Sequence, residues 1–219
     1  MSIVLPERYQ TKLIENKNHI AIITDLIDRI GDIYLENNLF FFEEYTDHGW
    51  RHINSVLKAS DELIPGESFE NLNSIDILLL VSSIMLHDIG MHVQLTTFIG
   101  LIKGEYDDTR CINFDNSNWS ELWVLYCNEA KRFSSKKRIE LFGYDIEKID
   151  FPLNFENKGP SETEKKLIGE FIRRYHPRLA HEIALKGIKT NKGYIQFFNE
   201  SVDPQIKDLA GLIARSHGM

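Results

Sequence analysis

Cysteine is scarce in this chain, and the features of exported and membrane proteins are missing. The only cysteines are Cys111 and Cys127, which cannot form the disulfide framework of a small secreted domain. The N-terminus has no basic segment followed by an apolar stretch, so it does not predict a signal peptide. Polar residues interrupt the longest apolar run, 75–86, which is shorter than the roughly 18 residues of a membrane span. We therefore expect a cytoplasmic protein that does not enter a membrane.

Basic residues are outnumbered by acidic ones, 25 to 33, which gives a formal net charge of −8. This balance argues against a general binder of duplex nucleic acid, because phosphate contacts need basic side chains. The densest basic segment, residues 131–138, has five Lys or Arg in eight positions. We interpret it as a solvated helix face, with contact to nucleic acid or a partner as the alternative.

Strand-like alternation is also absent over any useful length, and apolar residues recur with helical spacing instead. We therefore predict an all-α fold, as one domain or as a domain with an appendage. A stripe from Ile20 to Tyr34 that steps by three and four residues predicts a long N-terminal helix over about residues 8–38. Further helices are expected over residues 50–63, 74–90 and 120–142. The helix over 74–90 is apolar almost all round, so it should be central and buried.

Capping residues place several of the helix boundaries. Ser74 can cap the central helix. Ser161 and Glu164 have the spacing of a capping box that opens another helix. Asp203 followed by Pro204 is typical of a helix start, and the last helix is expected to run from there to the end of the chain.

Breaking signals place the remaining boundaries. Pro177 predicts a break, because proline disfavours helical geometry in the residue before it, here His176. A new helix would then run from Pro177 to Gly187. The stretches 107–119 and 148–160 are rich in turn-forming residues and are expected to be irregular.

Seven of the eight histidines fall in four short clusters, each at the start or end of a predicted helix. The clusters are His48 with His52, His87 with His92, His176 with His181, and His217 near the end of the chain. On one helix, residues 176 and 181 are about 140° apart, so both are not expected to point into one site. A single buried histidine is more often a hydrogen-bonded core residue than a ligand. The set of clusters, rather than any one member, therefore favours a metal site.

His87 and Asp88 stand side by side at the end of the most apolar predicted helix. A charged aspartate at that position costs roughly several kcal/mol unless it is paired or bound to a metal. Imidazole and carboxylate together suit a divalent transition metal such as Mn, Fe, Ni, Co or Zn, with positions left for water. We expect one or two such ions, with Mg as a further candidate.

The order H…HD…H…H resembles the HD-domain metal-dependent phosphohydrolase superfamily. His52, in the context TDHGWRH, matches the first histidine, and His87-Asp88, in the context LHDIG, matches the doublet that names the superfamily. His176 and His217 are similar to the additional histidines of the forms that bind two metals. The resemblance implies His52, His87 and Asp88 as ligands of a first metal, His176 and His217 as ligands of a second, and Asp88 as a bridge between them.

The resemblance covers about residues 45–219 and implies an HD-domain helical bundle there. Residues 1–44 would be an N-terminal helical segment that packs on the core, and residues 92–160 an insertion between metal-ligand helices. The pattern is closest to a bacterial HD subgroup that often precedes a heat-shock-type (GHKL) ATPase domain, so an ATPase domain or a homo-oligomer is an expected partner.

The pattern departs from the superfamily at its last ligand, which is an aspartate on a helix after the final histidine. Asp203 and Asp208 both precede His217, so neither matches by order. We therefore expect that the domain is truncated at its C-terminus.

The resemblance implies hydrolysis of a phosphoester, most often in a nucleotide, by metal-activated water. Asp88 and His48 are the catalytic candidates, with His48 orienting a ligand or transferring a proton; a hydrogen bond from His48 to the backbone is the alternative. An anionic substrate needs local positive charge, and an arginine fork can hold phosphate with two parallel bonds. The candidates for substrate binding are Arg51, Arg173, Arg174 and Arg178, each of which could instead form a surface ion pair.

Three other functions fit the same residues. A regulatory module could keep the nucleotide pocket without turnover, as a missing terminal aspartate would suggest. An assembly domain could use the first helix and the aromatic residues of the insertion for protein contacts. An oxidase with two irons could use the same ligands.

Overall fold

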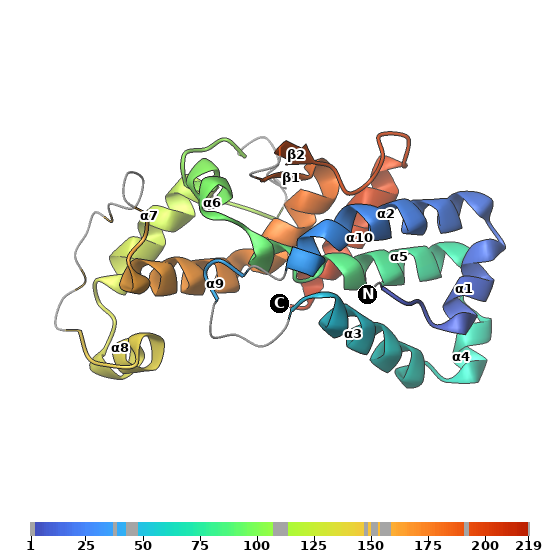
Figure 1. Cartoon of the computed structure of the whole chain (residues 1–219), viewed down its shortest axis with the longest axis horizontal. Coiled ribbons are helices and arrows are strands. Elements are labelled where there is room, and N and C mark those ends of the chain that lie inside the picture. Colours follow the sequence, from blue (N-terminus) through green and yellow to red (C-terminus); the bar gives the residue numbers. More distant parts are fainter. Residues whose placement is uncertain are drawn as a thin grey trace. The chain divides into compact units, whose positions relative to one another are not determined.

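The computed structural model describes residues 3–36, 39–42, 48–106, 114–146, 149, 153, 159–190 and 193–218. The described part is mostly helical, so the predicted fold class is confirmed (Figure 1). The chain divides into two compact units. The first comprises Met1–Asn38, Tyr45–His92 and His176–Met219, and the second comprises Leu39–Glu44 and Val93–Tyr175. Cys111 and most of the predicted irregular stretch 148–160 lie outside the described residues.

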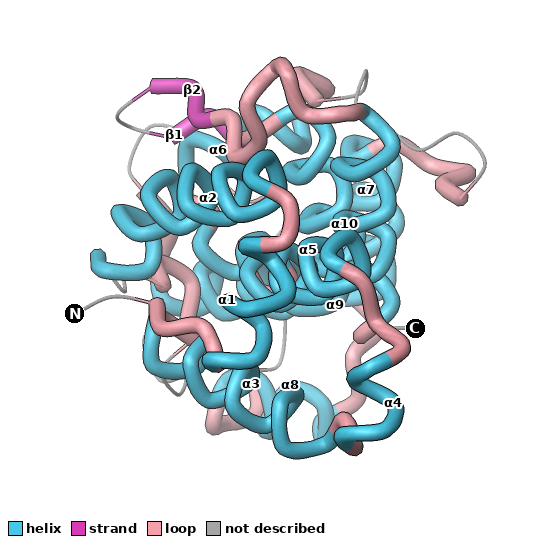
Figure 2. Tube along the Cα trace, turned by 90° about the vertical axis from the view of Figure 1, so that its right-hand side faces the viewer, coloured by secondary structure: helices cyan, strands magenta, loops and turns pink. Residues whose placement is uncertain are grey.

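The core of the first unit is the apolar helix α5 (Ser74–Leu86), whose residues are buried on nearly every side. The helices that pack against it are α1 (Glu7–Ile14), α2 (Lys17–Glu36), α3 (Trp50–Leu63) and α10 (Pro204–Ser216) (Figures 1 and 2). The stretch Ser74–His92 is long and apolar enough to meet the criteria for a membrane span, but 67% of it is buried within the protein. This burial is what a helix in the core of a folded domain shows. The prediction of a central, buried helix is confirmed.

The N-terminal segment forms two helices, α1 and α2, rather than the single helix predicted over 8–38. Asn16 explains the break. Its side-chain oxygen accepts a hydrogen bond from the backbone N–H of Asn18, as an N-cap residue does, so the chain turns there and a new helix begins. The predicted stripe survives within α2, because Ile23, Ile30 and Tyr34 are fully buried.

The start of α5 also differs by one residue from the prediction. The cap is Asn73 rather than Ser74, and it forms a capping box with Asp76. Ser74 is instead the first helical residue. Between α3 and α5 the chain adds a short helix, α4 (Gly66–Glu70), which follows Pro65.

Helix α9 (Glu162–Lys186) runs without interruption through Pro177, so the predicted break at that residue is wrong. Proline removes one backbone donor and disfavours the interior of a helix, but tertiary packing can override such a local preference. Within the second unit Phe171 and Ile172 are buried, and within the first unit Leu179 and Ala180 are buried. The opening of α9 at Ser161 and Glu164 is confirmed by their reciprocal hydrogen bonds.

A small antiparallel sheet follows α9, although the sequence predicted none. Strands β1 (Ile188–Thr190) and β2 (Gly193–Ile195) pair with Ile188 opposite Ile195. Gly187 ends α9 with a φ of +91°, and a side chain there would lie 2.2 Å from the backbone oxygen of Ile195. The strands are too short for alternation to reveal them. Helix α10 then begins at Pro204 behind the predicted cap Asp203.

The second unit contains α6 (Leu95–Ile102), α7 (Trp119–Ala130), α8 (Ser135–Phe142) and α9 up to Tyr175. The single helix predicted over 120–142 is therefore two, because Ser134 caps a new start. The ring of Phe171 contacts the rings of three other residues, with centroid distances of 5.1–6.1 Å to Phe98, Trp123 and Tyr126. The rings of Phe98 and Trp123 also contact each other, at 5.0 Å. Aromatic packing thus forms the core of this unit.

Candidate metal centre

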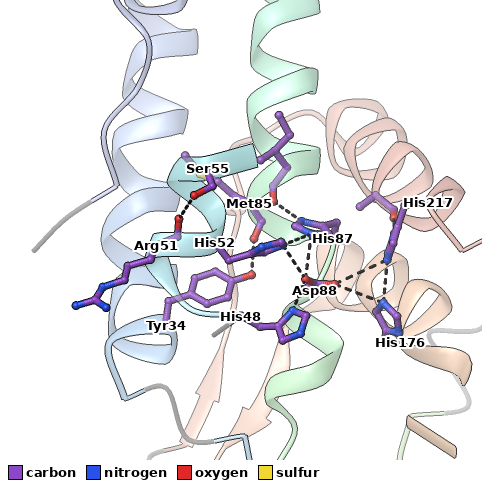
Figure 3. A network of polar contacts seen from close by, with 12 residues as sticks. Tyr34, His48, Arg51, His52, Ser55, Met85, His87, Asp88, His176 and His217 are labelled. Carbon is purple, nitrogen blue, oxygen red and sulfur yellow. Dashed lines mark hydrogen bonds and ion pairs between the residues drawn. The ribbon is translucent and has the colours of Figure 1, made fainter. Parts of the chain in front are cut away.

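Asp88 follows α5 and leads into a short 3-10 helix, η1 (Ile89–His92). Its side chain is only 8% exposed, and its two oxygens face different histidines (Figure 3). Oδ2 lies 2.9 Å from Nδ1 of His48, 3.2 Å from Nε2 of His52 and 3.0 Å from Nε2 of His87. We call these three residues the first histidine set.

The other oxygen of Asp88, Oδ1, faces histidines that are remote in the sequence. It lies 3.5 Å from Nε2 of His176 and 3.9 Å from Nε2 of His217. These two residues are the second histidine set. One carboxylate therefore stands between two groups of imidazoles, which is the arrangement of a bridging ligand.

Each histidine is positioned by the end of a helix or by a long helix. His48 lies just before α3, and His52 lies in its first turn. His87 is the C-terminal cap of α5, and His217 is the C-terminal cap of α10. His176 lies within α9. Rigid elements that start or stop at the centre can hold these side chains with little freedom.

Backbone carbonyls fix the orientation of two of the rings. Nδ1 of His87 lies 2.7 Å from the carbonyl oxygen of Ile84. Nδ1 of His217 contacts the carbonyl oxygen of Ala214 in the same way. Because a carbonyl only accepts, each Nδ1 carries a proton; Nε2 can then donate to Asp88 when the ring is protonated, and it offers a lone pair to a metal ion when the ring is neutral. Metal-ligating histidines are usually held by such a bond from the second nitrogen.

Two pairs of ring nitrogens approach one another closely. Nε2 of His176 lies 2.8 Å from Nε2 of His217, and Nε2 of His52 lies 3.2 Å from Nε2 of His87. Two lone pairs at such distances repel unless a proton or a cation lies between them. The ligand atoms of His48, His52 and Asp88, and those of Asp88, His176 and His217, lie within 4.8 Å of one another. This set of donors fits one or two divalent metal ions.

The electrostatics keep the carboxylate ionised. Burial raises the pKa of Asp88, but hydrogen bonds from His176 and from the first histidine set outweigh it and hold the pKa well below its usual range. Burial lowers the pKa of His87, whereas its hydrogen bond to Asp88 raises it, and the net shift is upward. Burial and the nearby His176 and His87 lower the pKa of His217. An anionic aspartate is the form that a metal needs.

The structure brings together all of the predicted metal ligands, and it adds one residue to them. His48, predicted to orient a ligand or transfer a proton, lies as near to Asp88 as the predicted ligands do and belongs to a group that could hold a metal. The sequence could not distinguish these roles, because Gly49 separates His48 from the start of α3 and the spacing does not say where the His48 side chain points. The assignment of each histidine to a metal stays a prediction.

Two further residues, His92 and Tyr34, support the centre, although the sequence did not predict either of them as a site residue. Nε2 of His92 lies 3.1 Å from the backbone oxygen of His48, and its ring packs edge-on against Tyr34. The hydroxyl of Tyr34 donates to the carbonyl of Met85 across 2.8 Å. The only sequence signal was the place of His92 beside His87 in the same cluster. Helical periodicity marked Tyr34 as buried but says nothing about its hydrogen bond.

Two of the predicted substrate-binding arginines, Arg51 and Arg178, belong to the first unit. Arg51 is exposed and lies over the ring of Trp50, with its guanidinium carbon 5.5 Å from the ring centroid. Arg178 is buried and forms an ion pair of 2.8 Å with Glu182 one turn along α9. Arg51 therefore presents its guanidinium toward solvent, while Arg178 is engaged in the core.

The other two arginine candidates belong to the second unit. Arg173 pairs with Glu170 at 2.8 Å. Arg174 pairs with Glu129 through two hydrogen bonds and with Glu170 at 3.8 Å. Their role in substrate binding stays a prediction.

Comparison with known proteins gives one match. Residues 42–219 match the family model described as HD-CE. No curated protein and no solved structure matches the chain. The matched range spans most of the chain and contains every residue of the histidine–aspartate centre. The chain therefore belongs to the HD-CE family and carries an HD-type domain.

Proposed function

We propose that this chain is a metal-dependent phosphohydrolase that acts on a nucleotide or a related phosphoester. One observation carries the proposal: Asp88 stands between two groups of side chains, each of which could hold a metal ion. The HD-type domain supports it, because the superfamily that the sequence resembles hydrolyses phosphoesters with such ligands.

The donor atoms indicate which metals would fit. Imidazole and carboxylate suit Mn, Fe, Ni, Co or Zn, whereas Mg prefers oxygen ligands and would depend on Asp88 and water. The chemistry that a bound metal supplies here is activation of water near neutral pH and neutralisation of charge on the phosphoryl group. Two ions would share Asp88, and a single ion would use one histidine set.

The residues of the chain prepare the site before any ligand arrives. Asp88 remains anionic because the histidines lower its pKa. His87 and His217 are held with Nε2 toward the centre by their hydrogen bonds to backbone carbonyls. Such preorganisation limits the reorganisation needed at the moment of reaction.

His48 and Arg51 are proposed to act on the substrate. Nδ1 of His48 is 2.9 Å from Oδ2 of Asp88, so Nε2 is the nitrogen proposed to exchange a proton with the substrate. The His48 side chain is 21% exposed, which gives the substrate access to it. Arg51 would bind the phosphate through the two parallel donors of its guanidinium; because this group points away from Asp88 in Figure 3, the role requires the side chain to turn toward the centre. Arg173, Arg174 and Arg178 are weaker candidates, since each already forms an ion pair with a glutamate.

The experiment is a metal analysis combined with an activity screen. Purified protein would be loaded with Mn²⁺, Fe²⁺, Ni²⁺, Co²⁺, Zn²⁺ or Mg²⁺ and incubated with a panel of nucleotides, with release of phosphate or nucleoside as the readout. The double variant His87→Ala with Asp88→Ala should lose both bound metal and hydrolysis. The control Glu200→Gln removes one exposed charge from the turn before α10 and should retain both.

The same assay separates the other functions. Unchanged metal content and hydrolysis in the double variant would contradict the proposal. Nucleotide binding that raises thermal stability without product formation would favour a regulatory module. A visible-range iron spectrum that responds to oxygen would favour an oxidase.

A further inference from the structure

Helix α10 ends at the centre, and it approaches α9 unusually closely on the way. At Gly211, an added Cβ would lie 2.6 Å from Cδ2 of His181 and 2.9 Å from the Cβ of Ala184. At Gly218, an added Cβ would lie 2.3 Å from Cγ of Pro177. Glycine in a helix costs about 0.5–1 kcal/mol relative to alanine, so its presence at Gly211 is explained by this contact.

One polar bond joins the same two helices. Nε2 of His181 lies 2.7 Å from Oδ1 of Asp208. The His181 side chain is 1% exposed, whereas the Asp208 side chain is 56% exposed. Because a carboxylate only accepts, Nε2 carries the proton and donates it. The buried ring gains a charge-assisted hydrogen bond while the aspartate keeps much of its hydration.

This bond and the glycine contacts fix the position of α10 along and around α9. A hydrogen bond of this kind tolerates changes of only a few tenths of an ångström, whereas one helical turn of sliding is about 5.4 Å. His217 follows Asp208 by about two and a half turns on α10, and His176 precedes His181 by about one and a half turns on α9. The pair therefore lies at the same contact between α9 and α10 that brings the two members of the second histidine set together.

We infer that His181 and Asp208 are positioning residues for the second histidine set. They touch neither metal nor substrate; they hold α10 on α9 in the register that places Nε2 of His217 2.8 Å from Nε2 of His176. The inference rests on the proposed function, because it assumes that the second set binds a metal ion. Residues that orient metal ligands typically contribute about 10–100-fold to metal affinity.

The test is a calorimetric titration of the metal-free chain, carried out once with Mn²⁺ alone and once with Zn²⁺ alone. The variant His176→Ala is titrated first, and the metal binding that it loses relative to the wild type is the binding that depends on the second histidine set. Asp208→Ala should weaken that part about tenfold or more and leave the remainder within about twofold. Asp208→Asn keeps an acceptor for His181 and should restore much of the affinity. Glu200→Gln is the charge-matched control and should bind as the wild type does.

Because the Asp208 side chain is more than half exposed, its variants are expected to fold, and a thermal melt checks this. Gly211→Ala gives an independent test, since the new methyl group pushes α10 from His181 and should weaken the same binding. Unchanged affinity in Asp208→Ala and Gly211→Ala would overturn the inference and leave the proposed function intact. Binding that His176→Ala does not alter would also overturn it. A wild-type chain that binds no metal would overturn the proposed function and the inference together.

Discussion

The two units of this protein differ most in where their histidines and aromatic side chains lie. All eight histidines belong to the first unit, whereas the second unit has none. The second unit instead holds Trp119, Trp123 and Tyr126, packed with Phe171. The first unit gathers five histidines around Asp88, and the second unit has an aromatic core. The comparison places the candidate metal centre in one unit and an aromatic core in the other.

The largest expected effect is on the stability of the second unit. Phe171 is fully buried and contacts several aromatic rings, so Phe171→Ala should destabilise the protein by about 3–5 kcal/mol. Denaturant unfolding measures this loss, and calorimetry at a temperature where the variant is folded measures metal affinity. Metal affinity should be unchanged; a parallel loss of both would break the separation between the units.

Removal of single ligands is the next largest effect. His52→Ala and His176→Ala should each lower the affinity for a divalent metal by more than about tenfold, since each removes one nitrogen donor near Asp88, and loss of a ligand costs at least as much as loss of a residue that orients one. Equilibrium dialysis with metal analysis provides the measurement. If the two ligand sets serve two ions, each variant should lose one ion per chain and retain the other. Equal loss of all metal in both variants would indicate one shared ion.

A pair of glycine variants sharpens the comparison further. A Cβ on Gly90 would lie 2.8 Å from the backbone oxygen of His176, so Gly90→Ala should displace His176 and weaken metal binding by about three- to tenfold. Gly100 in the second unit is the matched control, because the atoms nearest to a Cβ there belong to the side chains of Glu105 and Tyr106, at 3.0 Å, rather than to the backbone. Gly100→Ala should leave metal affinity unchanged. Equal effects of the two variants would contradict the account.

The smallest expected effect depends on pH. Burial raises the pKa of Glu170, but its ion pairs with Arg173 and Lys137 lower it more, so the net shift is downward. A carboxyl with a lowered pKa in the folded state adds stability at neutral pH, and this stability is lost as the pH falls through the folded-state pKa. Glu170→Gln should therefore be less stable than the wild type at about pH 7, and the difference should shrink as the pH falls below the usual glutamate pKa of about 4.3 and through the lowered folded-state pKa. A difference that grows in acid would contradict this sign.

The sequence predicted the helices best where local signals were strong. The bounds of α3 and the cap of α10 at Asp203 agree with the prediction, because apolar spacing and capping act within a few residues. The break at Pro177 was wrong, since burial on both sides of the proline overrode its local preference. The split at Asn16 was missed because one side-chain hydrogen bond decides it.

The centre could be predicted in its members but not in its geometry. The order of His52, His87-Asp88, His176 and His217 was enough to expect that they meet. Which oxygen of Asp88 each histidine faces depends on how helices pack, which spacing does not encode. The bond between His181 and Asp208 depends on the packing of α10 against α9 in the same way, and only the structure shows it.

Metal content of the wild type and of Asp88→Asn tests the central claim most directly. The substitution keeps the size of the side chain and removes the charge that both histidine sets face. After exposure to a transition metal and dialysis, the wild type should retain one or two ions per chain, and Asp88→Asn should retain essentially none. Wild-type protein without bound metal, or an Asp88→Asn variant with the same metal content as the wild type, would contradict the account.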